Sequence, residues 1–206
     1  AALATWIPMR SQQDLSYQMP PQVIADLMDA PPTPGVSLSP GQDWMLLLER
    51  PNLPSIEEVS EEELRLAGLR INPRNNGSSR SFYYNGMKLK PMRGGEEIIV
   101  QGLPEDARLE NVSWSPDGSR IAFTNSLDDG IELWMVDVTD AAARRLAGAV
   151  VNDAMRGNPY GWVDNRTLLY KSVLPDRGSV PAEPRVPQGP VVQFNEGKAA
   201  PVRTYQ

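Results

Sequence analysis

The chain has 206 residues, of which 40% are hydrophobic, and its formal net charge is −6. The acidic balance argues against nucleic acid or an anionic membrane surface as a partner, and no apolar run approaches the length of a transmembrane helix. The chain contains neither Cys nor His, which excludes a disulfide framework, the usual zinc sites and a Ser-His-Asp or Cys-His catalytic arrangement within it. We therefore expect this chain alone to have no catalytic residues, no metal and no cofactor.

The N-terminal residues 1–4 lack the basic region and the long apolar run of a signal peptide, and no initiator Met precedes them. Their composition indicates a processed or artificial start. The absence of Cys is compatible with export and with the cytoplasm. We expect an exported or periplasmic protein of a bacterium, with the cytoplasm or a plastid as the alternatives.

A short helix is predicted near the N-terminus. Pro20 and Pro21 precede it, Pro21 suits a first helical turn, and the helix ends before a proline-rich linker at residues 31–34. The helix has two interpretations, docking onto another domain or lying on its own domain. Its apolar positions follow helical spacing and are Val23, Ile24, Leu27 and Met28.

The rest of the chain is predicted to be β-structure. The sequence has 20 Pro and 16 Gly, which indicate many turns, and many turns fit an all-β architecture better than a helix bundle. One plan recurs in residues 36–48, 112–123 and 160–170: a short strand, a polar turn and an apolar strand. The second unit continues into strands at 131–138 and 143–146, which completes a four-stranded blade of roughly 40 residues, the usual size of a propeller repeat.

The first unit carries an insertion before its blade is complete. Ser55 and Glu58 have the spacing of a capping box, and the acidic stretch 57–63 is interpreted as a solvated helical face, with a binding patch as the alternative. Further along we expect a strand at 66–72, a loop at 74–80, strands at 81–84 and 87–89, and a Gly-Gly turn leading into 98–100.

The predicted fold is therefore all-β, a partial β-propeller of about two to three four-stranded antiparallel blades with a short N-terminal helix. Residues 1–35 form an arm, and residues 36–206 form blade one (about 36–104), blade two (about 105–147) and the start of blade three (about 148–206). Residues 175–206, rich in Pro and Gly, are expected to run as a long extended excursion with few regular pairs. Because propellers close with four to eight blades, the chain is either a fragment or completes itself with another chain.

Several strings in the sequence resemble one family of enzymes. They are Tyr17–Pro21, Asp29–Pro34, Leu66–Ile71, Trp162–Asp164, Ser172–Gly178 and Pro201–Gln206. From about residue 17 onward, the chain resembles the N-terminal region of the prolyl oligopeptidase family of serine peptidases. The most similar branch is the glutamyl endopeptidase-like one, from bacteria and chloroplasts. The linker and the Leu-Ala-Gly-x-Arg-Ile string are the most specific matches.

This resemblance implies a longer parent in which a propeller filters access to a C-terminal α/β-hydrolase domain that holds Ser, Asp and His. The chain would then be a non-catalytic gate and scaffold, whose partners are that hydrolase domain and the parent's peptide substrates. Self-association through open blade edges is a further expectation. The alternative is a stand-alone propeller-type module for protein interaction.

Two sets of residues are candidates for a role. Four tryptophans in or beside predicted inner strands are expected to be structural: Trp44, Trp114, Trp134 and Trp162. Three arginines around a predicted strand end would suit a substrate carboxylate, which Arg binds bidentately: Arg70, Arg74 and Arg80. The alternative for the arginines is pairing with the acidic stretch 57–63 or exposure to solvent.

Overall fold

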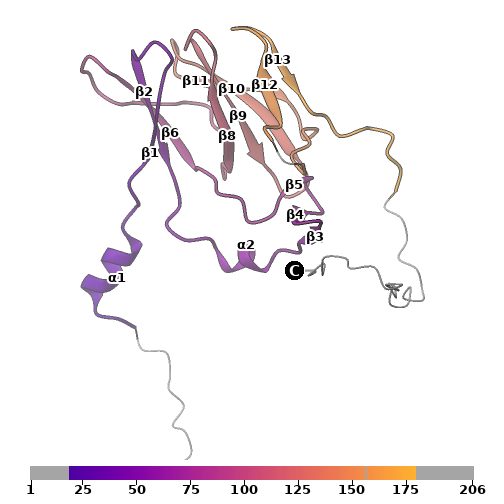
Figure 1. Ribbon diagram of the computed structural model, residues 1–206. Coiled ribbons are helices and arrows are strands. Elements are labelled where there is room, and N and C mark those ends of the chain that lie inside the picture. The colour runs from indigo at the N-terminus through magenta and orange to yellow at the C-terminus, as the bar shows by residue number, and fades with distance from the viewer. Residues whose placement is uncertain (1–18, 156, 180–206) are drawn as a thin grey trace, which may run out of the picture.

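In the computed structural model, which describes residues 19–155 and 157–179, antiparallel sheets stand side by side along the chain (Figure 1). Two of these sheets have four strands each, and a two-stranded sheet follows them. In both four-stranded sheets each strand pairs with the next one of its sheet, as in the blades of a propeller. The predicted all-β fold, a partial propeller with one short N-terminal helix, is confirmed.

The first sheet has the order β1-β2-β6-β7. Its strands are β1 (Gly35–Leu38), β2 (Trp44–Glu49), β6 (Gly86–Pro91) and β7 (Ile98–Ile99). The turn between β1 and β2 forms because the Ser39 hydroxyl accepts hydrogen bonds from the backbone N–H groups of Asp43 and Trp44, at 3.2 and 3.1 Å. The connection from β2 to β6 holds the insertion.

The second sheet is the most regular part of the chain. Its strands are β8 (Leu109–Trp114), β9 (Arg120–Ser126), β10 (Ile131–Asp137) and β11 (Ala142–Ala147), in the order β11-β10-β9-β8. In the β8–β9 turn the carboxylate of Asp117 accepts hydrogen bonds from the Ser115 and Ser119 hydroxyls, and Gly118 adopts φ 73°. The Ser-Pro-Asp-Gly sequence therefore makes the turn that its chemistry predicts.

The two smaller sheets differ in origin. One follows the second blade and consists of β12 (Tyr160–Trp162) and β13 (Leu168–Tyr170). The other belongs to the insertion and consists of β3 (Leu64–Leu66), β4 (Leu69–Asn72) and β5 (Gly77–Ser78). The insertion also holds the helix α2 (Ile56–Ser60), whose N-terminus has the predicted capping box between Ser55 and Glu58.

The core divides into two clusters of buried side chains. The larger lies between the first and second sheets and includes Leu46, Leu89, Phe123 and Val136. The smaller lies between the second sheet and β12–β13 and includes Leu133 and Tyr160. Three of the four candidate tryptophans pack half-buried against the larger cluster and the fourth against the smaller: Trp44, Trp114 and Trp134, then Trp162. Their contribution to stability remains a prediction.

The insertion departs from three expectations. Residues 66–72 are not one strand, because Ala67 (φ 49°) and Gly68 (φ 81°) form a two-residue turn that folds them into the β3–β4 hairpin. The loop predicted at 74–80 contains the short strand β5. Residues 81–84 are not a strand; Tyr84 alone pairs, by an isolated bridge with Leu109, while the neighbouring Tyr83 reaches back to α2.

The acidic stretch is also not a solvated helical face throughout. The helix α2 ends at Ser60, and the following residues lead into the β3–β4 hairpin (Figure 1). The side chains of Glu58, Glu61 and Glu63 are only 17%, 19% and 8% exposed, because arginines gather around them.

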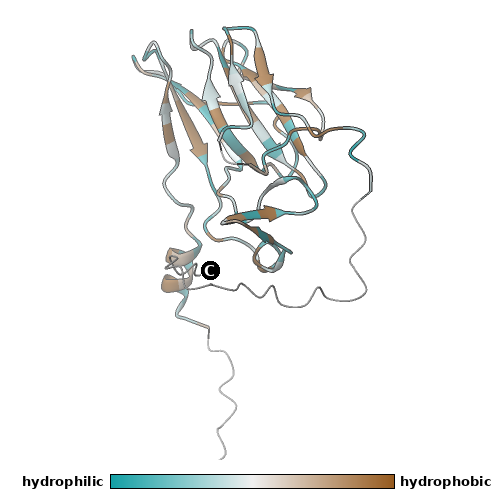
Figure 2. Ribbon diagram, turned by 45° about the vertical axis from the view of Figure 1, so that its right-hand side comes forward, coloured by the Kyte–Doolittle hydropathy of each residue, from teal (hydrophilic) through white to brown (hydrophobic). Residues whose placement is uncertain are grey.

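The N-terminal helix α1 (Gln22–Asp29) stands apart from the sheets (Figures 1 and 2). None of its residues is buried, and its apolar side chains are exposed. The amide of Asn52 donates a hydrogen bond to the Met28 carbonyl. Of the two interpretations of this helix, lying on its own sheets does not hold in the described part of the chain, while docking onto another domain stays a prediction.

No helix within residues 19–155 and 157–179 is long and apolar enough to cross a membrane. The expected extended excursion at 175–206 falls almost wholly outside the described residues, as do residues 17–18 and 201–206 of the resemblance.

Candidate functional site

A pocket of about 460 Å³ opens where the insertion meets the second blade. Figure 1 shows the insertion, with α2 and β3–β5, lying at one end of the upright sheets. The wall of the pocket comes from residues 50–61 and 72–83 of the insertion, and its other side from Arg108, Glu110 and Ser126 of the second blade. The pocket therefore depends on how the insertion is held to the blade.

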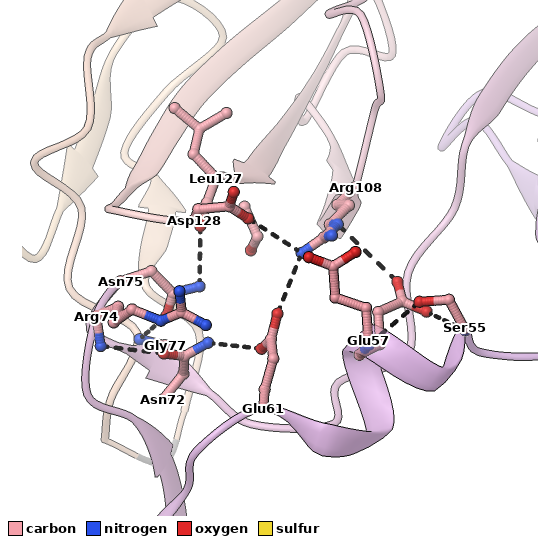
Figure 3. Close-up of polar contacts among 12 residues, drawn as sticks. Ser55, Glu57, Glu61, Asn72, Arg74, Asn75, Gly77, Arg108, Leu127 and Asp128 are labelled. Atoms are coloured by element: carbon pink, nitrogen blue, oxygen red, sulfur yellow. Dashed lines mark hydrogen bonds and ion pairs between the residues drawn. The ribbon is translucent and has the colours of Figure 1, made fainter.

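Arg108 is the main cation of that contact. It lies just before β8, and Figure 3 shows its guanidinium between carboxylates from both sides. Its Nη1 lies 3.8 Å from both Glu61 and Asp128, and its Nε lies 4.0 Å from Glu58. These are long ion pairs, so Arg108 balances several charges without a tight bidentate bond to one of them.

Glu58 has a second function besides capping α2. Its carboxylate accepts a 2.7 Å hydrogen bond from the Tyr83 hydroxyl. Burial works against ionisation of Glu58, but Tyr83, Ser55 and Arg108 outweigh it and hold the pKa of Glu58 below its usual range. Burial and the neighbouring Glu58 raise the pKa of Tyr83 to about 12. Tyr83 therefore stays a neutral donor, and Glu58 a fixed negative charge, on the pocket wall.

A second contact ties the tip of the insertion to the blade (Figure 3). The buried amide of Asn75 donates to the carbonyl of Leu127 at 3.1 Å, and its oxygen accepts from the backbone N–H of Gly77 at 2.9 Å. Nearby, Asn72 donates to Glu61 at 2.9 Å. A Cβ at position 77 would lie 2.8 Å from Cδ1 of Ile131 and 3.1 Å from Oδ1 of Asn75, so a larger residue would have to displace these side chains.

The carboxyl group of Glu110 lines the pocket on the side of the blade. It accepts a 2.7 Å hydrogen bond from the Ser126 hydroxyl. Burial raises the pKa of Glu110, the nearby Asp153 charge adds to this, and hydrogen bonds from Ser126 and Ser81 and the charge of Arg108 oppose it. The pocket thus combines a carboxyl that ionises reluctantly with the fixed charge of Glu58.

Two of the three candidate arginines, Arg70 and Arg80, lie together in the structure. Both pair with Glu63, a carboxylate of this chain. Arg70 lies 3.0 Å and Arg80 lies 3.5 Å from the carboxylate of Glu63, which also pairs with Arg65 at 2.8 Å. Hydrogen bonding from Arg65, with the charges of Arg70 and Arg80, lowers the pKa of Glu63 against a smaller opposing effect of burial. Their pairing with the acidic stretch is therefore observed.

Arg74 is placed differently. Its backbone N–H donates to Asn72, its side chain is exposed, and within residues 19–155 and 157–179 it forms no ion pair. Arg80 lines the pocket, while Arg70 and Arg74 do not. At the pocket rim another cation, Arg50, lies 5.6 Å above the ring of Phe82, a cation–π geometry.

The lining of the pocket combines groups of different chemistry. It offers apolar and aromatic surface from Leu53, Val59 and Phe82 beside charged and hydroxyl groups. The whole sequence lacks the imidazole on which a Ser-His-Asp or Cys-His arrangement depends. Among the described residues no group of three or more acidic side chains is arranged to hold a metal ion.

Sequence reasoning missed the residues that shape this pocket: Tyr83, Arg108, Glu110 and Asn75. The capping-box pattern located Glu58, but not its long-range partners. The Asn76-Gly77 pair is a turn signal and marks the tip that Asn75 anchors. Arg108 precedes a strand without any local pattern that distinguishes it, because its partners are distant in the sequence.

Comparison with curated proteins finds two plant relatives that cover nearly all of this chain. One, named "Probable glutamyl endopeptidase, chloroplastic" from Oryza sativa subsp. japonica, is 36% identical over 205 residues, which is 93% of this chain and 22% of the relative. The other, with the same name and from Arabidopsis thaliana, is 34% identical over 202 residues, which is 92% of this chain and 21% of the relative. The chain thus spans about a fifth of the length of the curated relatives that it matches.

No protein-family model matches the chain. Among solved structures, a putative TolB from Agrobacterium tumefaciens matches with a TM-score of 0.28 and 15% identity, covering 60% of this chain and 49% of that one. The fold assignment depends on the sheets of this chain and not on that likeness.

Proposed function

We propose that this chain is the non-catalytic N-terminal propeller portion of a serine peptidase of the prolyl oligopeptidase family, in the glutamyl endopeptidase-like branch. It scaffolds a C-terminal α/β-hydrolase domain and gates the access of peptides to it. The observation that carries the proposal is the similarity to two proteins named glutamyl endopeptidase over more than nine-tenths of the chain, in a chain that contains no His.

Gating is supported by the position of the insertion. It lies across one end of the sheets, and polar contacts rather than a core hold it there: Arg108 with its three carboxylates and Asn75 with the Leu127 carbonyl. Contacts of this kind open more readily than packed strands. The pocket beneath the insertion then gives an approaching peptide a place to bind.

For substrate charge we propose that Arg74 and Arg80 contribute more than Arg70. Arg80 lines the pocket and its guanidinium lies at the longer distance from Glu63, whereas Arg70 lies closer to Glu63 and outside the pocket. Arg74 is exposed and has no acidic partner among the described residues. Arg74 can therefore meet a carboxylate on a peptide directly, and Arg80 can do so by exchanging its 3.5 Å ion pair with Glu63.

The chloroplastic names of the relatives favour a plastid location for the parent over export from a bacterium. The stand-alone interaction module remains the alternative function. Intact mass of the source protein separates the two, because a module has a mass of 22.7 kDa and a peptidase subunit is several times larger.

Activity-based labelling tests the main proposal. A fluorophosphonate probe, which reacts with activated serines, is expected to label the full-length parent but not the isolated 206-residue chain, and only the parent should cleave peptides after Glu. A full-length protein that neither reacts with the probe nor cleaves peptides would refute the proposal.

The arginine assignment is tested on the full-length enzyme by comparing kcat/KM for matched Glu and Gln substrates. Arg74→Ala and Arg80→Ala should lower the Glu/Gln ratio, whereas Arg70→Ala should change it less. Arg93→Ala, an exposed arginine outside the pocket, is the control. A ratio that is unchanged in all variants would mean that selectivity is set elsewhere in the protein.

A further inference from the structure

A groove of about 380 Å³ lies between the second blade and the β12–β13 pair. The side of the blade and the side of the β12–β13 pair both contribute apolar groups. The lining residues from the two sides are Leu133, Met135 and Leu146, then Trp162, Leu168 and Tyr170. Tyr170 and the neighbouring Leu169 remain 38% and 71% exposed.

The equivalent space between the first two blades is filled. Trp114 pairs with Ile121 in the second blade as Trp162 pairs with Leu168 in the next unit, so Leu168 and Tyr170 correspond to Ile121 and Phe123. Ile121 and Phe123 are fully buried. The neighbouring strand β10 covers part of both residues. The rings of Trp134 and Phe123 stack with their centroids 6.3 Å apart, and Val136 is fully buried.

The β12–β13 pair has no counterpart of β10 among the described residues. A stretch of the sequence beyond them resembles β10 residue by residue. Residues 191–195 read Val-Val-Gln-Phe-Asn where β10 reads Leu-Trp-Met-Val-Asp at 133–137, and the Ala-Ala of 199–200 stands where the second blade has Ala141-Ala142. The alternation of apolar and polar residues is that of a strand with one buried face.

We propose that residues 191–195 pair antiparallel along the free edge of β13 and fill the groove. Transferring the β9–β10 register, in which Ala122 is opposite Met135 and Ile121 opposite Val136, places Gln193 opposite Leu169 and Phe194 opposite Leu168. Val192 then lies opposite Tyr170. In this register Val192 and Phe194 face the second blade, on the same face as Leu168 and Tyr170.

Charge supports the same occupant. Three arginines line the groove, and no carboxylate does so among the described residues: Arg120, Arg144 and Arg166. Val138, the residue after β10, donates its backbone N–H to the Ser119 carbonyl in the β8–β9 turn. In the transferred register Glu196 takes the place of Val138 and comes beside Arg166 of the β12–β13 turn. The proposed register thus places the carboxylate of Glu196 in the basic part of the groove.

An unpaired edge strand is a template for association with another chain, and pairing with residues 191–195 removes it. The proposed pairing does not depend on whether the parent is a peptidase.

Disulfide trapping tests this register, because the chain has no Cys of its own. Residues directly opposite in antiparallel strands have Cα atoms within the range that a disulfide spans. Leu169→Cys with Gln193→Cys should form an intramolecular disulfide in nearly all molecules under mild oxidation, identified by peptide mass. The matched control, Leu169→Cys with Val192→Cys, shifts one position by a single residue and should form far less.

Equal trapping in both pairs, no trapping in either, or disulfide-linked dimers from Leu169→Cys alone as the main product would each overturn the proposal. Hydrogen exchange provides a second measurement that needs no cysteine. Phe194→Asp in the full chain should increase exchange of the backbone N–H groups of residues 168–171 at least tenfold, with blade-two strands unchanged. Unaltered exchange at 168–171 would refute the pairing even if the cysteine variants failed to fold.

Discussion

The second blade and the insertion of the first blade are held together by opposite means. In the second blade, strands of six and seven residues bury apolar side chains such as Ile121, Phe123 and Val136. In the insertion, residues 50–85, the least exposed side chains are polar or charged, those of Asn72, Asn75 and Glu63, and no apolar residue is buried. The blade depends on packing, and the insertion depends on a small number of hydrogen bonds and ion pairs.

This difference has a physical consequence for function. Packed strands lose a large amount of apolar contact when they separate, whereas exposed ion pairs contribute little to stability. We therefore expect the insertion to open at a lower free energy than the blade, and a ligand in the pocket between them to influence that opening. The following predictions test this contrast.

Trp134→Ala is expected to have the largest effect. Trp134 stacks on Phe123 and packs against the larger core cluster, and removing a large aromatic side chain from a core costs about 3 kcal/mol or more. Urea unfolding followed by circular dichroism measures the loss. Trp134→Phe, which keeps an aromatic ring on Phe123, should lose clearly less. An unchanged unfolding midpoint for Trp134→Ala would mean that this blade does not depend on packing.

Asn75→Ala is expected to loosen the insertion and to spare the blade. The change leaves the Leu127 carbonyl and the Gly77 N–H without their partner, a cost of about 1–3 kcal/mol. Hydrogen exchange should increase in residues 72–78 and stay constant in β9 and β10. An equal increase in both regions would show that insertion and blade unfold as one unit, against the contrast drawn above.

The same contrast explains how much the sequence revealed. The blade strands were predictable, because one-sided burial leaves an alternating pattern and the Ser115–Gly118 turn has strong local chemistry. The capping box of Ser55 was predictable for the same local reason.

The pocket was not predictable. Arg108 meets Glu58 across fifty residues of chain, and Asn75 reaches Leu127 across a similar separation, so no local pattern records either contact. The β3–β4 hairpin was missed because its turn uses Ala67 at positive φ, a residue that rarely adopts this conformation.

Ser55→Ala tests the smaller local contribution within the insertion. The Ser55 hydroxyl accepts a hydrogen bond from the backbone N–H of Glu58, and the Glu58 carboxylate accepts one from the backbone N–H of Ser55. Loss of an N-cap serine costs about 1 kcal/mol. Hydrogen exchange of residues 56–60 measures the effect, with Ser60→Ala at the other end of α2 as the control. Equal exchange in the two variants would contradict a role for the cap.

Glu110→Gln is expected to have the smallest effect on stability among these changes. The effect should be near zero at acid pH and should grow as the pH rises. Burial raises the pKa of Glu110 in the folded protein above its usual value of 4.5, which the unfolded chain keeps. Below that value both states hold the proton and the charge has no effect on stability. As the pH rises, the unfolded state ionises first, so the folded state of the wild type loses stability until Glu110 ionises there as well.

The amide that Glu110→Gln introduces has no such loss and still provides an oxygen for the Ser126 hydroxyl. The difference in Tm, variant minus wild type, should therefore be near zero below about pH 4 and positive at neutral pH. Asp153→Asn is the matched control, since burial also raises the pKa of Asp153 but Asp153 does not line the pocket; it should show the same sign. A difference that stays constant from acid to neutral pH would mean that the carboxyl of Glu110 is solvated, and that the pocket is open to water even where it meets the blade.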